Sequence, residues 1–424
     1  MNKIFKTGCL AFVFNVGLFP IGLWCQTTMN LPQVIREARQ HTTLSTLEGI
    51  IQQENEAGIS NINKKWLPQL QFQAQASYQS ETSGIDLSFP GINIPRLSKD
   101  QYKMQADISQ MLYDGGSSSA LRKIQSQKSD LEKNVVSNEI DAIAETAIQI
   151  YYAIAEAEQR MKQTALTIQD LEAGIQRAKV AIDAGVMLAS EGDHLRAELL
   201  KLTALYEEIG VSVKAGYEAI TLLTGKKVEK LQLEEAQLPD TTLNSRAPFL
   251  LQFDLQKSLA QANGKWESTS ILPKLTLFAQ AGYGKPGLNF LKNEFEPFYI
   301  AGMRLSWQLS AFYTYHNQQQ LTQLSMAKTE ARKTELGNRK MIKNRQLYND
   351  WDRLIKSTAR DEEMVALREK ILSTAEVQLA NGNITAAEYL VKLNDVAEAR
   401  INKELNEIKK NKNSWLMQIN MGWL

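Results

Sequence analysis

Four short segments of the chain alternate between apolar and polar residues. The first, residues 69–78, reads Gln-Leu-Gln-Phe-Gln-Ala-Gln-Ala-Ser-Tyr. Its apolar positions are two apart, which is the period of a β-strand with one apolar and one polar face. The pattern recurs over residues 102–112, 274–283 and 299–309. We therefore expect four amphipathic strands of about ten residues, a length that suits a membrane-spanning strand.

Two kinds of sheet show this alternation, the wall of a transmembrane β-barrel and a soluble half-buried sheet. The aromatic residues favour the barrel, because five of them lie near strand ends, where an aromatic girdle meets the membrane interface. These five are Tyr78, Tyr102, Tyr283, Tyr299 and Trp307. In a barrel the apolar strand face contacts lipid. The residues expected to face lipid are Leu70, Phe72, Leu277 and Leu305.

Four strands are too few for a closed barrel, since the smallest barrels have about eight. An open sheet edge is not tolerated in lipid, so several chains must share one barrel. Two chains would give about eight strands with an interior filled by side chains, whereas three would give about twelve and a pore. The segments 81–100 and 285–297 join the strands in pairs. They are rich in Gly, Pro and polar residues and are expected to be exposed loops.

Long stretches of the chain have the pattern of helices. From Ser117 to about Asp183 there is no proline and one internal glycine, and a continuous helix of that length would approach ~100 Å. Segments 195–220 and 390–408 repeat apolar residues at spacings of three and four, which is the seam of a coiled coil. Shorter helices are expected over 30–64 and 249–266.

Two tight turns divide the long helices into pairs. The first contains Ala184-Gly185 and then Ser190-Glu191-Gly192-Asp193; the second contains Asn381-Gly382 and then Thr385-Ala386-Ala387-Glu388. Glycine commonly ends a helix, and Ser or Thr followed three residues later by an acid is a capping box at the start of the next one. We therefore expect two helical hairpins, the first with a turn about two residues longer than the second.

The whole pattern occurs twice. Trp66-Leu67-Pro68-Gln69-Leu70 opens the first strand, and Ile271-Leu272-Pro273-Lys274-Leu275 opens the third about 205 residues later. Gly185 corresponds to Gly382, about 197 residues further on. An ordered repeat of this length indicates a duplicated structural unit.

These features divide the chain into four parts. Residues 1–25 are expected to be a signal peptide, 26–225 a first repeat, 226–247 an irregular, charged connector, and 248–424 a second repeat. The fold class predicted is a mixed α/β membrane protein with an internal duplication.

The N-terminus has the features of a secretory signal peptide. Lys3 and Lys6 precede an apolar run from Cys9 to Trp24, with cleavage expected after Cys25. An uncleaved membrane anchor and a lipidated Cys25 are the alternatives. A mature chain beginning after Cys25 would contain no cysteine, so its stability must come from packing and assembly. No later run of about 20 apolar residues predicts a transmembrane helix.

Composition argues against several functions. The 48 basic and 47 acidic residues nearly balance, which does not favour a nucleic-acid partner. The three histidines are far apart in sequence, share no metal-ligand spacing and lie in no nucleophile pattern. Ser325-Met326-Ala327-Lys328 matches a Ser-x-x-Lys pattern but lies inside a predicted long helix, and Asp114-Gly115-Gly116 is a strand-to-helix turn with Ser117 as a possible cap. We expect no enzyme activity, no cofactor and no metal site.

Together these motifs resemble the TolC family of outer-membrane efflux proteins over essentially the whole mature sequence. The resemblance rests on the duplicated order of the Leu-Pro-x-Leu strand starts, the tyrosine-containing second strands, the Asp114-Gly115-Gly116 turn and the Gly382…Thr385…Glu388 turn. It implies a homotrimer in the outer membrane, with a twelve-stranded barrel in lipid and a barrel of long antiparallel helices in the periplasm. It implies a passive exit duct that docks on a periplasmic adaptor and an inner-membrane RND or ABC transporter.

The resemblance also assigns roles to the helical turns. The adaptor would dock at the turns that contain Gly185, Ser190, Asp193, Gly382 and Thr385. Family members carry acidic residues after the second turn that ring the tunnel entrance. Glu388 falls at the first such position and Val391 at the second, so Glu388 is the candidate gate, or it is only a helix cap.

Two other classes of protein were weighed against an exit duct. A periplasmic adaptor also has long helical hairpins, but it carries one hairpin and no duplicated membrane strands. A structural coiled-coil envelope protein would have no amphipathic strand pairs. The cargo stays open, because a wide duct has no shaped pocket.

Overall fold

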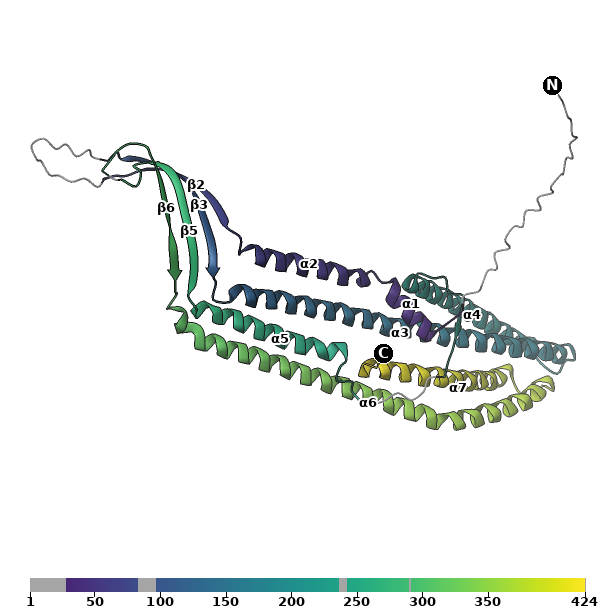
Figure 1. Cartoon of the computed structure of the whole chain (residues 1–424). Helices are drawn as coiled ribbons and strands as arrows, with labels where there is room; N and C mark the ends of the chain where they lie inside the picture. The colour runs from purple at the N-terminus through teal and green to yellow at the C-terminus, as the bar shows by residue number, and fades with distance from the viewer. Residues whose placement is uncertain (1–27, 83–96, 236–241, 290, 424) are drawn as a thin grey trace, which may run out of the picture.

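The computed structural model describes residues 28–82, 97–235, 242–289 and 291–423. The molecule is elongated, with a four-stranded sheet at one end and the turns of two long helical hairpins at the other (Figure 1). The predicted signal peptide, with Cys25, lies outside the described residues.

The sheet contains the four predicted strands, β2 (Gln69–Tyr78), β3 (Asp100–Tyr113), β5 (Lys274–Lys285) and β6 (Glu296–Ser306). They pair antiparallel in the order β2-β3-β5-β6, so the two sequence-adjacent pairs meet at β3 and β5. Strand β6 lies about three residues earlier than its alternation predicts, because the chain turns towards a helix at Gln308, whose carbonyl accepts from the Ala311 N–H. Trp307 therefore follows the strand.

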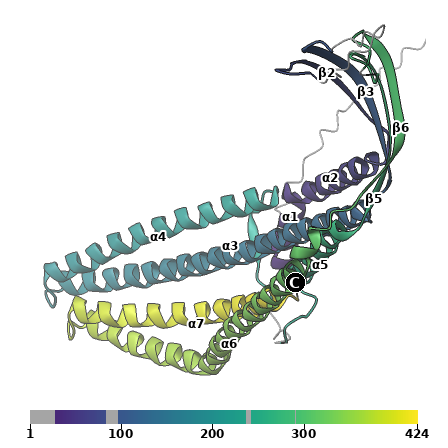
Figure 2. The same ribbon diagram turned by 90° about the vertical axis from the view of Figure 1, so that its left-hand side faces the viewer.

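The sheet is curved, and its strands arch away from the axis of the helices (Figure 2). Its register shifts between Met111 and Tyr113, where a bulge ends the β3–β5 ladder. Within the described chain, β2 and β6 each have one long edge that pairs with no other strand. A sheet of this length with two open edges requires further strands if it lies in lipid.

Two antiparallel helix pairs make up most of the molecule. Helix α3 (Ser117–Asp183) pairs with α4 (Ala189–Thr224), and α6 (Ala311–Ala380) pairs with α7 (Ala386–Met421) (Figure 2). The predicted long helices are thus present, and the Ser325–Lys328 pattern lies inside α6. The apolar spacing predicted for α4 and α7 buries Leu195, Leu393, Leu405 and Ile408.

The helix predicted over residues 30–64 is two helices, α1 (Leu31–His41) and α2 (Leu44–Lys64). The break occurs because Thr42 leaves the helical conformation with a ψ of 138°. Its hydroxyl then accepts from the Leu44 N–H at 3.3 Å. A β-branched Thr-Thr pair carries this turn without glycine or proline, which is why the sequence pattern missed it.

The connector between the repeats is partly regular. Its strand β4 (Lys230–Gln232) pairs in parallel with β1 (Thr28–Asn30). The Tyr151 hydroxyl of α3 donates to the Gln232 carbonyl at 2.5 Å, and both Tyr151 and Tyr152 are buried beside it. The N-terminus of the described chain is therefore fixed to the middle of the molecule by backbone pairing.

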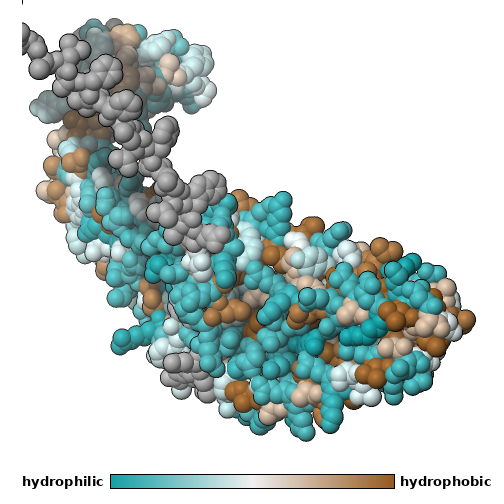
Figure 3. Space-filling view, turned by 90° about the vertical axis from the view of Figure 1, so that its right-hand side faces the viewer, coloured by the Kyte–Doolittle hydropathy of each residue, from teal (hydrophilic) through white to brown (hydrophobic). Residues whose placement is uncertain are grey.

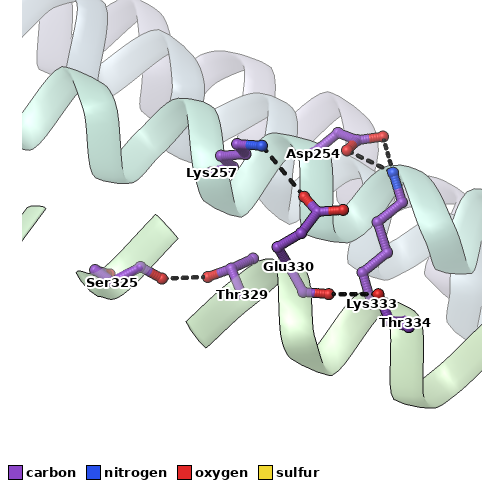
Figure 4. A network of polar contacts seen from close by, with 7 residues as sticks. All are labelled: Asp254, Lys257, Ser325, Thr329, Glu330, Lys333 and Thr334. Atoms are coloured by element: carbon purple, nitrogen blue, oxygen red, sulfur yellow. Dashed lines mark hydrogen bonds and ion pairs between the residues drawn. The ribbon is translucent and has the colours of Figure 1, made fainter. Parts of the chain in front are cut away.

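The second repeat continues with α5 (Pro248–Ser268), a short 3-10 helix η1 (Thr269–Ile271) and then β5. Two ion pairs join α5 to α6: Lys333 contacts Asp254 at 2.7 Å, and Lys257 contacts Glu330 at 3.2 Å (Figure 4). The charges alternate in sign along each helix. Sliding α5 past α6 by one turn would therefore place like charges opposite each other.

Contacts recur at equivalent positions of the two repeats. Gln110 donates from its side-chain amide to the Trp66 carbonyl, and Trp307, about 197 residues later, donates from its indole to the Ile271 carbonyl. A Cβ on Gly58 would meet Gln125 at 2.8 Å, and one on Gly264 would meet Thr322 at 2.7 Å. In both repeats, then, glycine permits the same close crossing of a short helix over a long one.

No helix in the described ranges combines the length and the apolar character needed to cross a membrane.

Candidate functional site

The strand register assigns every sheet residue to one of two faces, since directly paired residues point the same way. One row across the sheet contains Leu70, Ile108, Ala279 and Ala301, and the next contains Phe72, Ala106, Ala281 and Tyr299. Gln110, Leu277 and Met303 form a further row of this face. The four residues predicted to face lipid, Leu70, Phe72, Leu277 and Leu305, therefore share one predominantly apolar face.

This apolar face is exposed within the single chain. The exposed fraction of the four predicted residues lies between 42% and 74%, for Leu70, Phe72, Leu277 and Leu305. A contiguous apolar surface of this kind is rare on a protein in water. The structure adds Met104, Ile108 and Met303, which the sequence reasoning did not single out and which share the face and are also exposed. Because no element of the described chain covers this surface, it requires an apolar environment.

The aromatic residues separate into two groups along the strands. Tyr78, Tyr102, Tyr283 and Tyr299 all lie within about three residues of the loop end of their strands, whereas Trp307 follows β6 at the helix end. The sequence analysis missed two further aromatic residues near these strand ends. Tyr113 ends β3 beside the helices, and Phe295 stacks on Tyr283 at 5.6 Å between ring centres. Aromatic side chains thus lie at both ends of the apolar face.

The opposite face of the sheet is largely polar. Its β2 positions are Gln69, Gln71, Gln73, Gln75 and Ser77, and its β3 positions include Lys103, Gln105, Asp107 and Ser109. The exceptions are Met111 on β3 and Phe278, Phe298 and Ile300 on β5 and β6. One polar and one apolar face are what a barrel wall with a water-filled interior needs.

The two hairpin turns lie together at the far end of the helices (Figure 2). Gly185 and Gly382 adopt positive φ angles of 73° and 69°, as predicted for glycine helix caps. In each turn the N–H of the residue after the glycine donates to a carbonyl of the last helical turn, Val186 to Ala181 and Asn383 to Gln378, both at 2.9 Å. These are the hydrogen bonds of the Schellman motif.

Two predictions about the first turn are wrong. Its connection, residues 184–188, has the same length as residues 381–385, because α4 begins at Ala189 rather than after Ser190. Ser190 is consequently inside the helix, the N-cap is Leu188, and no side chain caps α4. Asp193 instead lies 3.9 Å from Arg196 as an exposed ion pair.

The second turn has the predicted capping box. Thr385 accepts from the Glu388 N–H at 3.2 Å, and the Glu388 carboxylate accepts from the Thr385 N–H at 2.9 Å. The cap role of Glu388 is therefore present in the single chain.

Glu191 is a functional candidate that the sequence reasoning missed. It lies in the first turn of α4, yet its carboxylate accepts from the Ala386 N–H, the first amide of α7, at 2.6 Å. Gly382 lies so close to the first turn that a Cβ there would meet the Val186 carbonyl oxygen at 2.6 Å. The two turns are thus joined by a charged hydrogen bond and a close backbone approach.

Polar contacts continue the link between the hairpins. Arg400 of α7 contacts Asp170 of α3 and Glu369 of α6, each at 2.9 Å. Burial opposes the charge on Arg400, but its hydrogen bonds to Glu369 and Asp170 outweigh it and hold the Arg400 pKa above its usual value. Tyr389 is buried against Gly174 and donates to the Asp170 carbonyl at 3.3 Å. Burial, helped by Glu376, raises the Tyr389 pKa to about 12, so this hydroxyl stays a donor at neutral pH.

A groove runs between α6 and α7 beside the second turn and has a volume of about 510 Å³. Its lining includes Ile371, Ile384, Glu388 and Val391, with Lys370 and Lys392 at its margin. Figure 3 shows apolar side chains gathered among hydrophilic ones at this helical end of the molecule. The end that carries the turns is therefore amphipathic rather than uniformly polar.

The strand-to-helix turn of the first repeat is capped differently from the prediction. Ser117 is the first residue of α3 and not its cap. The Asp114 carboxylate accepts from the Gly116 N–H at 2.9 Å and from the Ser118 N–H at 2.6 Å. Asp114 thereby fixes the angle between β3 and α3. Among the described residues there is no group of three or more His, Cys, Asp or Glu side chains that could hold a metal ion.

Comparison with known proteins identifies the fold. No protein-family model matches the sequence, and no curated protein matches it. Among solved structures, the outer-membrane channel OprN superposes with a TM-score of 0.72 at 12% identity, covering 93% of this chain and 90% of that one. The outer membrane protein VceC from Vibrio cholerae gives 0.67 at 13% identity, covering 92% and 94%. The Campylobacter jejuni CmeC outer membrane channel gives 0.66 at 14% identity, covering 93% and 85%.

These structures match the sheet and both helical hairpins, since they cover more than nine tenths of this chain. At this level of identity the match establishes the fold, while the side chains are this chain's own. The chain has the fold of the TolC-family outer-membrane channels, as its duplicated sequence motifs predict.

Proposed function

We propose that this protein is the outer-membrane exit duct of a tripartite efflux or type I secretion system. In this role it is a passive channel with its sheet in the outer membrane and its helices in the periplasm. The observation that carries the proposal is the sheet itself: one exposed apolar face, one polar face and two open edges in a chain with the fold of outer-membrane channels.

The proposed assembly is a homotrimer, whose shared barrel would leave no sheet edge open to lipid. Three copies of the sheet would place β6 of one chain beside β2 of the next and close a barrel of about twelve strands around a pore. Helix α4 supports assembly, because Leu200, Val211 and Leu222 are each at least 70% exposed along its outer face in the single chain. A neighbouring helix would cover them.

The hairpin turns are proposed as the docking end for a periplasmic adaptor, which in turn binds an inner-membrane RND or ABC transporter. The positions concerned are Gly185, Ser190, Asp193, Gly382 and Thr385. They lie at the end farthest from the sheet, and the apolar groove between α6 and α7 opens beside them. Cysteines at Ala189 and Asn383 should crosslink to the adaptor in intact cells, while one at Asn289, in the loop between β5 and β6, should not.

Glu388 is proposed as the entrance gate. In a trimer three copies of its carboxylate would approach the tunnel axis, where like charges attract cations and repel one another. Val391, the second position of the acidic ring in the family, is apolar and lines the groove. The gate proposed here therefore has one acidic position per chain.

The membrane assignment is tested by an arginine scan of the two sheet faces. Phe72→Arg or Leu277→Arg, which lie further inside their strands than Leu70 and Leu305, should cost ~2–4 kcal/mol and lower the yield of a particle with three times the protomer mass in mild detergent. The matched controls, Gln71→Arg and Thr276→Arg, differ by one residue and lie on the polar face, so they should assemble normally. Equal loss on both faces, or a stable wild-type monomer in detergent, would exclude the shared barrel.

A further inference from the structure

The polar face of the sheet carries an unequal distribution of charge. Its basic residues are Lys103, Lys274 and Arg304, and none of them has an ion-pair partner among the described residues. Its acidic residues are Asp107 and Glu296. Glu296 is neutralised by Lys292 at 2.9 Å, which leaves Asp107 alone. Three unpaired positive charges and one negative charge give this face a net charge of +2 in each chain.

Two of the basic groups are held against the sheet by aromatic rings. The Lys103 ammonium lies 5.1 Å from the centre of the Phe298 ring, and the Arg304 guanidinium lies 4.9 Å from that of Phe278. Such cation–π contacts fix the position of a charge without neutralising it. Both basic side chains are nevertheless exposed, so their charges act on whatever fills the space above this face.

Glycines on the facing strands make room for these rings. A Cβ on Gly282 would fall 2.5 Å from Phe298, and one on Gly302 would fall 3.2 Å from Phe278. Each of β5 and β6 thus supplies a phenylalanine that covers a glycine of the other strand. This reciprocal arrangement places one aromatic ring under Arg304 and another under Lys103.

The phenylalanines and glycines of this arrangement all belong to the second repeat, on β5 and β6. The position about 197 residues before Arg304 is Asp107, and the corresponding residues for Phe298 and Gly302 are Gln101 and Gln105. Gln105 donates to both carboxylate oxygens of Asp107, at 3.0 and 2.9 Å. Both repeats therefore have a strand at this place, but the acid Asp107 of the first repeat is replaced by the base Arg304 in the second. Basic residues consequently predominate on the polar face.

We propose that the barrel interior is an anion-favouring segment of the duct, set by Lys103, Lys274 and Arg304. The inference rests on the proposed function, because the polar face lines a lumen only in a closed barrel. Three chains would then bring a net charge of about +6 to the lumen wall, in two zones: Arg304 and Lys274 near the helices and Lys103 near the external end. A charged ring in a narrow pore concentrates counter-ions. The solutes favoured are organic anions that carry carboxylate or phosphate groups.

The test is the permeability ratio of chloride to potassium for the intact trimer in a planar bilayer under a salt gradient. The double variant Lys103→Gln/Arg304→Gln should lower this ratio about two- to threefold. Asp107→Asn removes the opposing charge and should raise it.

The variants are measured both in the wild-type protein and in Glu388→Ala, so that charge at the entrance does not mask the effect. Lys103→Arg/Arg304→Lys, which keeps the charge, should behave as wild type, and Asp107→Asn tests the inference if the glutamine variant fails to assemble. A conducting trimer whose ratio is unchanged by the double variant and by Asp107→Asn would overturn the inference and leave the duct intact. A trimer with no conductance even when Glu388 is replaced by alanine would overturn the proposed function itself.

Discussion

The two hairpin turns have the same backbone but different caps. Each has five connecting residues, a glycine with positive φ and the same Schellman hydrogen bonds. The N-terminus of α7 has a capping box from Thr385 and Glu388, whereas the N-cap residue of α4 is Leu188, whose side chain makes no capping hydrogen bond.

One residue accounts for much of this difference. Leu188 and Thr385 are equivalent, about 197 residues apart, as are Glu191 and Glu388. Because Leu188 has no hydroxyl, Glu191 has no capping box to complete, and its carboxylate reaches α7 instead, where it accepts from the Ala386 N–H. A change that weakens one helix end therefore supplies a contact between the two hairpins. Duplicated units can diverge in this way without any change in backbone geometry.

The largest effect is expected from replacing the two glycines. Gly185→Ala should cost roughly 1–2 kcal/mol of local stability, since a non-glycine residue must adopt a left-handed conformation in open space. Gly382→Ala should cost roughly 2–4 kcal/mol, because its Cβ would also meet the Val186 carbonyl oxygen. Hydrogen exchange of the turn amides in the assembled protein measures both. Equal costs would mean that the two turns do not touch.

Loss of the cross-hairpin contact is the next largest effect. Glu191→Ala should lower the opening free energy at the start of α7 by about 1–2 kcal/mol, because the Ala386 amide loses a charged acceptor. Exchange at Ala386 should quicken while exchange within α4 changes little. Asp193→Ala, an exposed acid two residues further on, is the control. If α4 alone were destabilised, Glu191 would be acting on its own helix.

Glu388→Ala distinguishes the gate from the cap. As a cap only, Glu388 should contribute roughly 1 kcal/mol of local stability at Thr385, with conductance and selectivity unchanged. As a gate, its loss should also lower cation preference and weaken block by divalent cations in single-channel recordings, with the trimer yield unaltered. Selectivity identical to wild type would decide for the cap.

Leu188→Thr should have the smallest net effect and is the sharpest test of the comparison. The new hydroxyl offers Glu191 a capping box in its own helix, worth about 1 kcal/mol to α4. If Glu191 is drawn into it, exchange at the start of α4 should slow while exchange at Ala386 quickens. Protection that rises at α4 with no loss at Ala386 would show that the two contacts are independent.

The sequence predicted the regular parts of this fold well because each has a strong local period. Strict alternation predicted β2 and β5 to within about two residues, and the absence of proline predicted α3. The sequence reasoning failed where a helix is broken without glycine or proline, at Thr42, and where strand β6 ends before Trp307. It also placed the start of α4 after Ser190, since a Ser-x-x-Asp pattern resembles a cap even inside a helix.

The sequence by itself determined which residues share a strand face or a helix seam, because side-chain period is a property of the backbone. The duplication, the glycine caps and the Thr385–Glu388 box follow from spacing in the same way. Only the tertiary structure decided which residues meet across the repeats: Glu191 with Ala386, Arg400 with Asp170, and the phenylalanines of β5 and β6 with each other's glycines. Such contacts depend on the relative placement of elements far apart in the chain, about which a local period carries no information.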